Sequence, residues 1–198
     1  QGDINQDVPA DQGGDLPPST FSSLAKEGYK PEASEGTQIA TTGPTYTKIL
    51  EKHANPLMRI LDWGAGRGKG TKEGKDAGYS IEGFEPNSNP DKRDIAPEYT
   101  DATQIPDESQ DLIINNAVVN VVPENVGREI VRTIYKKLKP GGSAFIQSRS
   151  WNDIKGMLET SKTKLVGPRE VITSKGTFQK GYTPETLRML IEQEVPDA

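Results

Sequence analysis

The chain has 198 residues and a net charge of −5, and its length favours one domain with a buried core. Hydrophobic residues make up only 32% of it, so we expect part of the chain to lie outside that core. It has no cysteine, which excludes disulfides, thiolate metal sites and cysteine nucleophiles.

The N-terminal segment 1–20 is built mainly from Asp, Gln, Gly, Pro and Ser, and we expect it to be disordered or loosely packed. A short helix is predicted over 21–29, and a Thr-rich loop, 36–47, follows. Gly43-Pro44 then opens a predicted helix over 44–53. The chain shows no signal peptide or long apolar run, which predicts a cytoplasmic protein without a membrane partner.

The most informative stretch, 60–70, reads Ile-Leu-Asp-Trp-Gly-Ala-Gly-Arg-Gly-Lys-Gly. A short apolar strand that ends in an acid and a glycine-spaced turn brings bare backbone against a nucleoside cofactor. A dinucleotide fingerprint would need glycine at position 69, and a phosphate-binding P-loop would need glycine at 63 and Ser or Thr at 70. The chain has Lys69, Trp63 and Gly70 there, so neither of these phosphate-binding motifs fits.

The following segments alternate between strand and helix patterns, which indicates a parallel sheet with right-handed crossovers. Strands are predicted over 59–63, 79–85, 98–100, 110–115 and 143–148, with helices over 72–77 and 124–138 and an irregular loop over 86–97. The C-terminal third is predicted to contain a helix over 152–159, a hairpin of 169–173 and 177–182, and a helix over 184–194.

The pattern acid-x-Gly-x-Gly-x-Gly after a hydrophobic strand resembles motif I of the class I S-adenosylmethionine-dependent methyltransferases, and the resemblance covers about 45–149. It implies a Rossmann-like α/β fold, with a parallel sheet of order 3-2-1-4-5 and helices on both faces. That fold normally closes with an antiparallel hairpin. Either 169–182 stands in for this edge or the closing strands belong to residues absent from the chain, and we favour the second.

In this interpretation 21–198 is a single domain, with N-terminal helices and a lid in 21–58, a cofactor-binding core in 59–149 and a substrate-side segment in 150–198. The loop 37–46 is the candidate lid. Because the chain lacks an initiator Met, we expect it to belong to a larger polypeptide or assembly.

The resemblance implies S-adenosylmethionine as the cofactor and no metal. Asp62 and the amides of the glycine loop would hold the aminocarboxypropyl arm, and Glu85 would accept both ribose hydroxyls, since a carboxylate can accept two hydrogen bonds. Asp101-Ala102 resembles the motif that meets the adenine. The candidate cofactor-binding residues are Tyr46, Asp62, Gly64, Ala65, Gly66, Glu85, Pro86, Asp101, Ala102 and Asn116.

The fourth predicted strand is followed by Asn-Asn-Ala-Val-Val-Asn-Val-Val-Pro at 115–123. It lacks the Asp-Pro-Pro-Tyr or Asn-Pro-Pro-Tyr clamp of adenine- and cytosine-amino methyltransferases. Together with 173–180, it resembles small bacterial and phage methyltransferases, including those found beside DNA-phosphorothioation genes. Asn116 is the candidate catalytic residue, which would position a nucleophile; the alternative is that it caps the strand end.

The segment 149–182 carries seven Lys or Arg against three acids. A basic surface there could follow a phosphate backbone, but the chain is acidic overall and we favour an ordinary solvated face for these residues. Nucleic acid is still the first candidate for the partner and methyl acceptor. Small-molecule and protein acceptors are the alternatives within the same enzyme class. A different class of function is a catalytically silent S-adenosylmethionine-binding module of a larger phage or plasmid protein.

Overall fold

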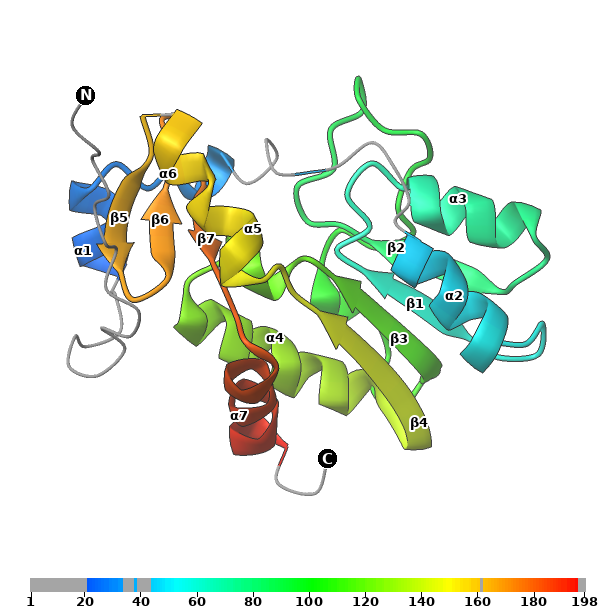
Figure 1. Cartoon of the computed structure of the whole chain (residues 1–198). Coiled ribbons are helices and arrows are strands. Elements are labelled where there is room, and N and C mark those ends of the chain that lie inside the picture. The colour runs from blue at the N-terminus through cyan, green and yellow to red at the C-terminus, as the bar shows by residue number, and fades with distance from the viewer. Residues whose placement is uncertain (1–20, 34–37, 39–43, 161, 196–198) are drawn as a thin grey trace, which may run out of the picture.

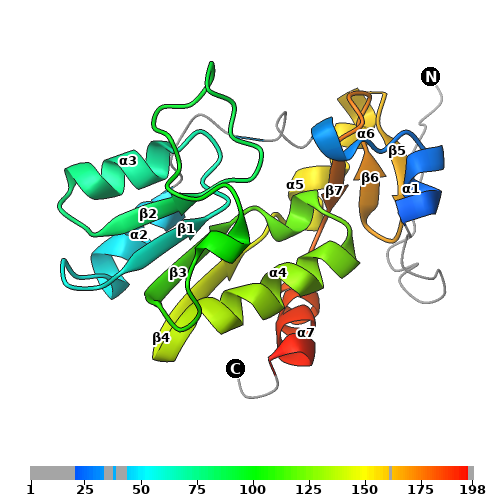
Figure 2. The same ribbon diagram turned by 180° about the vertical axis from the view of Figure 1, so that it is seen from behind.

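The computed structural model describes residues 21–33, 38, 44–160 and 162–195. They form a parallel α/β unit and a smaller antiparallel sheet, which lie side by side (Figure 1 and, from behind, Figure 2). The segment 1–20 and most of the candidate lid, 37–46, fall outside the described residues. Among the described residues, no helix has the length and apolar character needed to cross a membrane.

The larger sheet contains four parallel strands in the order β2-β1-β3-β4. These strands are β1 (Ile60–Trp63), β2 (Ile81–Phe84), β3 (Gln110–Asn116) and β4 (Leu138–Gln147). All four residues of β1 are buried, as expected for a central parallel strand. They correspond to the second, first, fourth and fifth predicted strands, so the predicted order is confirmed for these four.

The predicted strand 98–100 is present only as an isolated parallel bridge between Phe84 and Tyr99 at the β2 edge. Glu98 explains why it extends no further: its carboxylate accepts the amide of Gly83 at 2.6 Å, so a side chain replaces a ladder bond. The predicted irregular loop 86–97 is confirmed, since no helix or strand forms there.

Helices cover both faces of this sheet. On one face, α2 (Pro44–His53) buries Tyr46, Ile49 and Leu50 against the side chains of β1, β2 and β3, and α3 (Lys69–Asp76) lies beside it. On the other face, α4 (Glu124–Lys137) buries Ile134 with residues of β1 and β3. The helix predicted over 72–77 corresponds to α3, which begins earlier than predicted, at Lys69.

The C-terminal segment begins with two short helices, α5 (Trp151–Lys155) and α6 (Met157–Thr160). It continues with the antiparallel strands β5 (Lys164–Gly167), β6 (Glu170–Ile172) and β7 (Phe178–Lys180), followed by α7 (Pro184–Glu194). The predicted hairpin and last helix are confirmed, whereas β5 was not predicted. In the described residues β7 and β4 share no ladder, and Tyr182 makes only an isolated bridge to Ser150 beyond the end of β4, so 169–182 does not add a strand to the parallel sheet.

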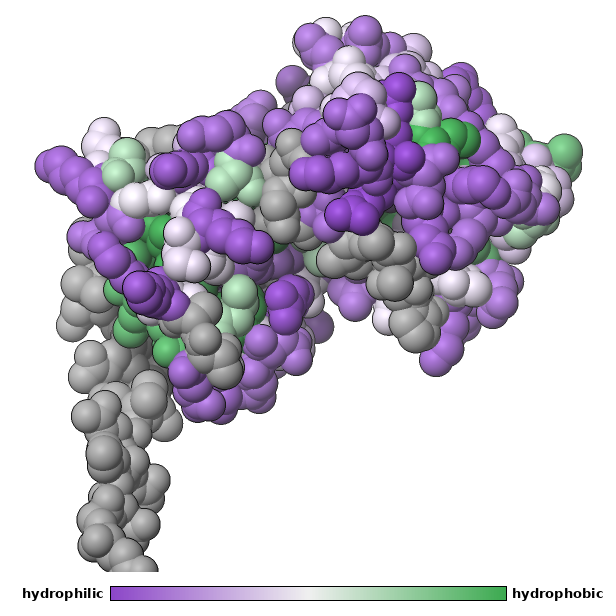
Figure 3. All heavy atoms as spheres, turned by 90° about the horizontal axis from the view of Figure 1, so that it is seen from above, coloured by the Kyte–Doolittle hydropathy of each residue, from purple (hydrophilic) through white to green (hydrophobic). Residues whose placement is uncertain are grey.

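The small sheet has its own apolar core. The helix α1 (Phe21–Lys26) contributes Leu24, which packs with Tyr29, Ile172 and Phe178. The predicted helix 21–29 therefore ends early. Seen from above, the surface of both parts is largely hydrophilic (Figure 3), in keeping with the low apolar content of the sequence.

Candidate functional site

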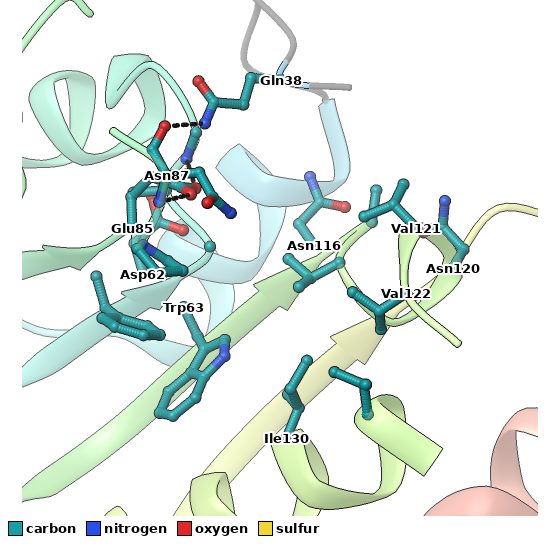
Figure 4. A pocket seen from close by; sticks show the side chains of 18 of the residues that line it. Gln38, Asp62, Trp63, Glu85, Asn87, Asn116, Asn120, Val121, Val122 and Ile130 are labelled. Carbon is teal, nitrogen blue, oxygen red and sulfur yellow. Dashed lines mark hydrogen bonds between the residues drawn. The ribbon is translucent and has the colours of Figure 1, made fainter. Parts of the chain in front are cut away.

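A cavity of about 1060 Å³ lies at the carboxyl ends of the parallel strands (Figure 4). Open α/β sheets bind their ligands at this edge. Trp63, Glu85, Asn116 and Gln147 line it from the four strand ends, and Gln179 lines it from β7 of the small sheet. The cavity is therefore bounded by both parts of the molecule.

The glycine loop after β1 forms part of the lining. Gly64 has a φ of +80°, and a Cβ there would lie 2.3 Å from Cγ2 of Val118, so no other residue fits without a shift. The amides of Gly64 and Ala65 both donate to the carbonyl of Phe84, and the amide of Gly66 donates to Glu85. These three amides are engaged within the protein, so other atoms of the loop would make its contacts to a ligand.

Asp62 is the penultimate residue of β1 and lines the cavity, although its side chain is almost fully buried. Its Oδ2 accepts the Thr71 hydroxyl at 2.8 Å. The buried Tyr46 hydroxyl also faces Asp62 and opposes the rise of its pKa, but it makes no well-formed hydrogen bond within the described part of the chain. Burial dominates and raises the pKa of Asp62 to about 6.

Glu85 follows β2 and is also buried. Its Oε2 accepts the amide of Gly66 at 2.8 Å, and its Oε1 accepts the amide of Asn87 at 3.0 Å. Burial raises the pKa of this carboxyl, while the two amides and Gln38 oppose the rise. Gln38 Nε2 also donates to the carbonyl of Asn87 at 3.0 Å (Figure 4). Each carboxylate oxygen has a further lone pair for a ligand.

The structure brings most of the predicted cofactor residues together. Those that line the cavity are Tyr46, Asp62, Gly64, Ala65, Gly66, Glu85, Pro86, Ala102 and Asn116. Asp101 is not among the lining residues. It is exposed, and its Oδ1 accepts the amide of Thr103 at 2.8 Å to cap the short helix η2 (Ala102–Gln104), which lowers its pKa. The role of Asp101 at an adenine ring stays a prediction.

Asn116 ends β3, and its register partner across the strand pair is Gln147 of β4. The chain then turns through the short helix η3 (Val119–Val121). In this turn Asn120 Nδ2 donates to Gln179 Oε1 at 3.1 Å, which joins the turn to the small sheet. Figure 4 shows the carboxamides of Asn116 and Asn120 across the cavity from Asp62 and Glu85.

Three of the seven basic residues of 149–182 have partners or positions that take them out of an open cationic surface. Lys180 is largely buried, and its Nζ contacts Glu124 Oε2 at 2.6 Å and Glu170 Oε1 at 2.9 Å. Lys164 pairs with Glu27 at 3.8 Å. Arg149 lines the cavity instead.

The sequence analysis missed several lining residues, among them Gln38, Trp63, Gln147 and Gln179. Trp63 stands inside the glycine motif, and Gln147 near the end of a predicted strand, so the strand-end rule could have indicated both. Gln179 carried no local signal, because its place depends on how the small sheet packs.

A family model described as a methyltransferase domain matches residues 39–190. None of the curated proteins matches the chain. Among solved structures, a 1,6-didemethyltoxoflavin-N1-methyltransferase of Burkholderia thailandensis with bound 1,6-didemethyltoxoflavin and S-adenosylhomocysteine has a TM-score of 0.58 and 16% identity, covering 91% of this chain and 81% of that one.

Two further structures share the fold. An S-adenosylmethionine-dependent methyltransferase of Methanosarcina mazei has a TM-score of 0.59 and 19% identity, covering 77% of this chain and 84% of that one. A possible histamine N-methyltransferase of Thermotoga maritima has a TM-score of 0.53 and 20% identity, covering 75% and 70% respectively. The Rossmann-like α/β fold implied by the glycine motif is thereby confirmed.

Proposed function

The chain belongs to the methyltransferase domain family, and from this premise we propose that it methylates a small molecule bound in the cavity beside Asn116. It is an S-adenosylmethionine-dependent methyltransferase, as its glycine motif predicts. The observation that supports the acceptor is the cavity itself, in which Asn116 and Asn120 lie opposite the two acids.

The residues at the acidic end fit this cofactor. Glu85 offers one further acceptor position on each oxygen, which is what a ribose diol requires. Asp62 offers a carboxylate to an ammonium group. Gly64 has no Cβ, and a Cβ at this position would collide with Val118. When bound, S-adenosylmethionine would supply an electrophilic methyl group to the acceptor, with S-adenosylhomocysteine as the second product and one proton released from the acceptor to water.

The chain's own contribution is alignment in a site shielded from water. Asn116 has a donor and an acceptor on one carboxamide, with which it can orient a nucleophile. Trp63, Val118 and Val122 add apolar lining to the cavity. An amine or amide nitrogen needs little help from a base, in keeping with a cavity lined by neither His nor Cys among the described residues.

A nucleic-acid acceptor is the second candidate, since the basic surplus of 149–182 could follow a phosphate backbone. Its electrostatic support is reduced, because Lys180 and Lys164 are paired with acids. The Burkholderia protein, by its description, binds a heterocyclic compound. At 16% identity we take from it only the choice of nitrogen heterocycles as first probes.

Calorimetry with S-adenosylmethionine is the first test. We expect binding by the natural chain and loss of binding by the double variant Asp62→Ala, Glu85→Ala. Transfer of a tritiated methyl group to DNA, RNA, protein and small-molecule fractions of a lysate then identifies the acceptor. Label in the DNA fraction alone would contradict the small-molecule proposal, and binding without label in any fraction would favour a silent module.

A further inference from the structure

The cavity has two chemically different ends. One end holds the carboxylates of Asp62 and Glu85, and the other is lined by carboxamides. These amide side chains come from four separate elements, which are the end of β3, the turn η3, the end of β4 and the strand β7. They are Asn116, Asn120, Gln147 and Gln179, and we call them the amide group.

The buried members of the amide group are incompletely bonded. Asn120 is 1% exposed and Gln179 is 5% exposed. Asn120 donates to Gln179, but its own Oδ1 is buried and finds no donor among the described residues. Oε1 of Gln147 is also buried and finds no donor among the described residues. Two buried oxygens in one cavity therefore lack a hydrogen-bond donor, a condition that proteins rarely leave unsatisfied.

Apart from Asp62, Glu85 and the partly buried Lys69, the charged side chains that line the cavity are exposed, namely Glu32, Glu129 and Arg149. Arg149 Nη2 also donates to the carbonyl of Asp153 at 3.4 Å. The buried amides carry no net charge. A charged ligand pressed against them would lose its hydration without gaining a counter-charge, whereas a neutral polar ligand would not incur that cost.

An apolar wall stands beside the amide group. Val118, Val121 and Val122 line the same end, and Val118 also packs over the glycine loop at Gly64. Aliphatic side chains on one side and carboxamides on the other suit a flat molecule with a polar edge.

We infer, on the basis of the proposed function, that the acceptor is an uncharged molecule with an adjacent hydrogen-bond donor and acceptor, held by the amide group. Carboxamides, lactams and the N–H/C=O edge of a nitrogen heterocycle have this pattern. Their N–H groups match the orphan oxygens of Asn120 and Gln147, and their carbonyls match an amide N–H. The register of Asn116 beside Gln147 places both amides at the same edge of the sheet.

Matched pairs of probes test the charge preference. Nicotinamide and nicotinate, benzamide and benzoate, and uracil and orotate differ mainly by a carboxylate. We would measure their binding by ligand-observed NMR to the full chain saturated with S-adenosylhomocysteine. We expect the neutral member to bind about tenfold more tightly in at least one pair. Equal or tighter binding of the carboxylates, or binding by no neutral probe, would overturn the inference.

Variants locate the binding. Asn120→Leu and Gln147→Met remove an amide while keeping much of the side-chain volume, and each should weaken the best neutral probe about tenfold. Gln147 is only partly buried, so Gln147→Met remains informative if Asn120→Leu does not fold. Asn152→Leu, at an exposed position in α5, is the matched control and should change nothing. Unchanged binding in both cavity variants would also overturn the inference.

Calorimetry separates this inference from the proposed function. If S-adenosylhomocysteine binds normally but the neutral probes do not, only the acceptor class is wrong. If neither S-adenosylmethionine nor S-adenosylhomocysteine binds, both proposals fail. Asn120→Leu and Gln147→Met should keep their cofactor affinity within about twofold, because neither Asn120 nor Gln147 bonds to Asp62 or Glu85 in the described structure.

Discussion

The carboxylate of Glu85 accepts the backbone amide of Gly66 at 2.8 Å, so the residue after β2 fixes the loop after β1. Glu85→Gln would turn an NH₂ group toward Gly66 or Asn87, both of which are donors. We expect a loss of roughly 1–3 kcal/mol of stability and at least about tenfold weaker binding of S-adenosylmethionine. Urea unfolding and calorimetry would measure the two effects.

The matched control is Glu51→Gln, at an exposed position in α2. It should leave both the unfolding free energy and the cofactor affinity close to those of the natural chain. Unchanged cofactor affinity in Glu85→Gln would show that the carboxylate is not a cofactor ligand.

A steric prediction follows from Gly64. Gly64→Ala introduces both a positive-φ strain and a contact of 2.3 Å with Val118, whereas Gly78→Ala introduces a similar strain at φ +89° with no atom within 4 Å. We expect Gly78→Ala to cost about 1–2 kcal/mol and Gly64→Ala to cost more. Urea unfolding measures the difference, and the double variant Gly64→Ala, Val118→Ala should recover part of it. Equal costs for the two single variants would refute the clash.

Asp62 predicts a pH dependence. Burial raises its pKa from 3.8 to about 6, so the folded chain binds more protons than the unfolded chain between these values. The contribution of Asp62 to stability therefore falls as pH rises through this window. Asp62→Asn does not titrate there, so its stability relative to the natural chain should increase on the order of 1 kcal/mol from pH 5 to pH 8.

Urea unfolding at several pH values checks this prediction. Asp91→Asn, at an exposed site, is the control and should track the natural chain across the range. A constant difference between Asp62→Asn and the natural chain would mean that the pKa of Asp62 is not raised.

Local patterns in the sequence predicted the elements whose packing is periodic. The helix over 44–53 is confirmed at both ends, because Tyr46, Ile49 and Leu50 recur at helical spacing. The last helix is confirmed for a different local reason, since Thr183 caps it by accepting the amide of Thr186.

The edge elements could not be predicted in the same way. The strand 164–167 is short and half exposed, and it exists because β6 pairs with it. The predicted strand 98–100 has β-forming residues, yet Glu98 caps the ladder instead of extending it. The same limit applies to the site, where Asp62 and Glu85 lie near the ends of locally predictable strands but Gln179 enters from a distant sheet.

The buried ion pairs of Lys180 give the last prediction. Lys180→Met would leave Glu124 and Glu170 without their shared cation, and Glu170 is almost fully buried. We expect a loss of about 3 kcal/mol in stability. Lys164→Met, which removes an exposed pair with Glu27, should cost less than about 1 kcal/mol. Similar losses in thermal or urea unfolding would contradict a structural role for Lys180.

The bond between Asn120 and Gln179 joins the turn after β3 to β7, while the strands of the two sheets share no ladder. The glycine loop and its acids depend on the parallel sheet alone, whereas one wall of the acceptor end is carried by the antiparallel one. On the proposed function, substitution of Gln179 would therefore alter which acceptor is methylated while the methyl donor's site stays unchanged. Such a division would let one scaffold diverge toward new acceptors, and it marks Gln179 as the position to vary when engineering substrate choice.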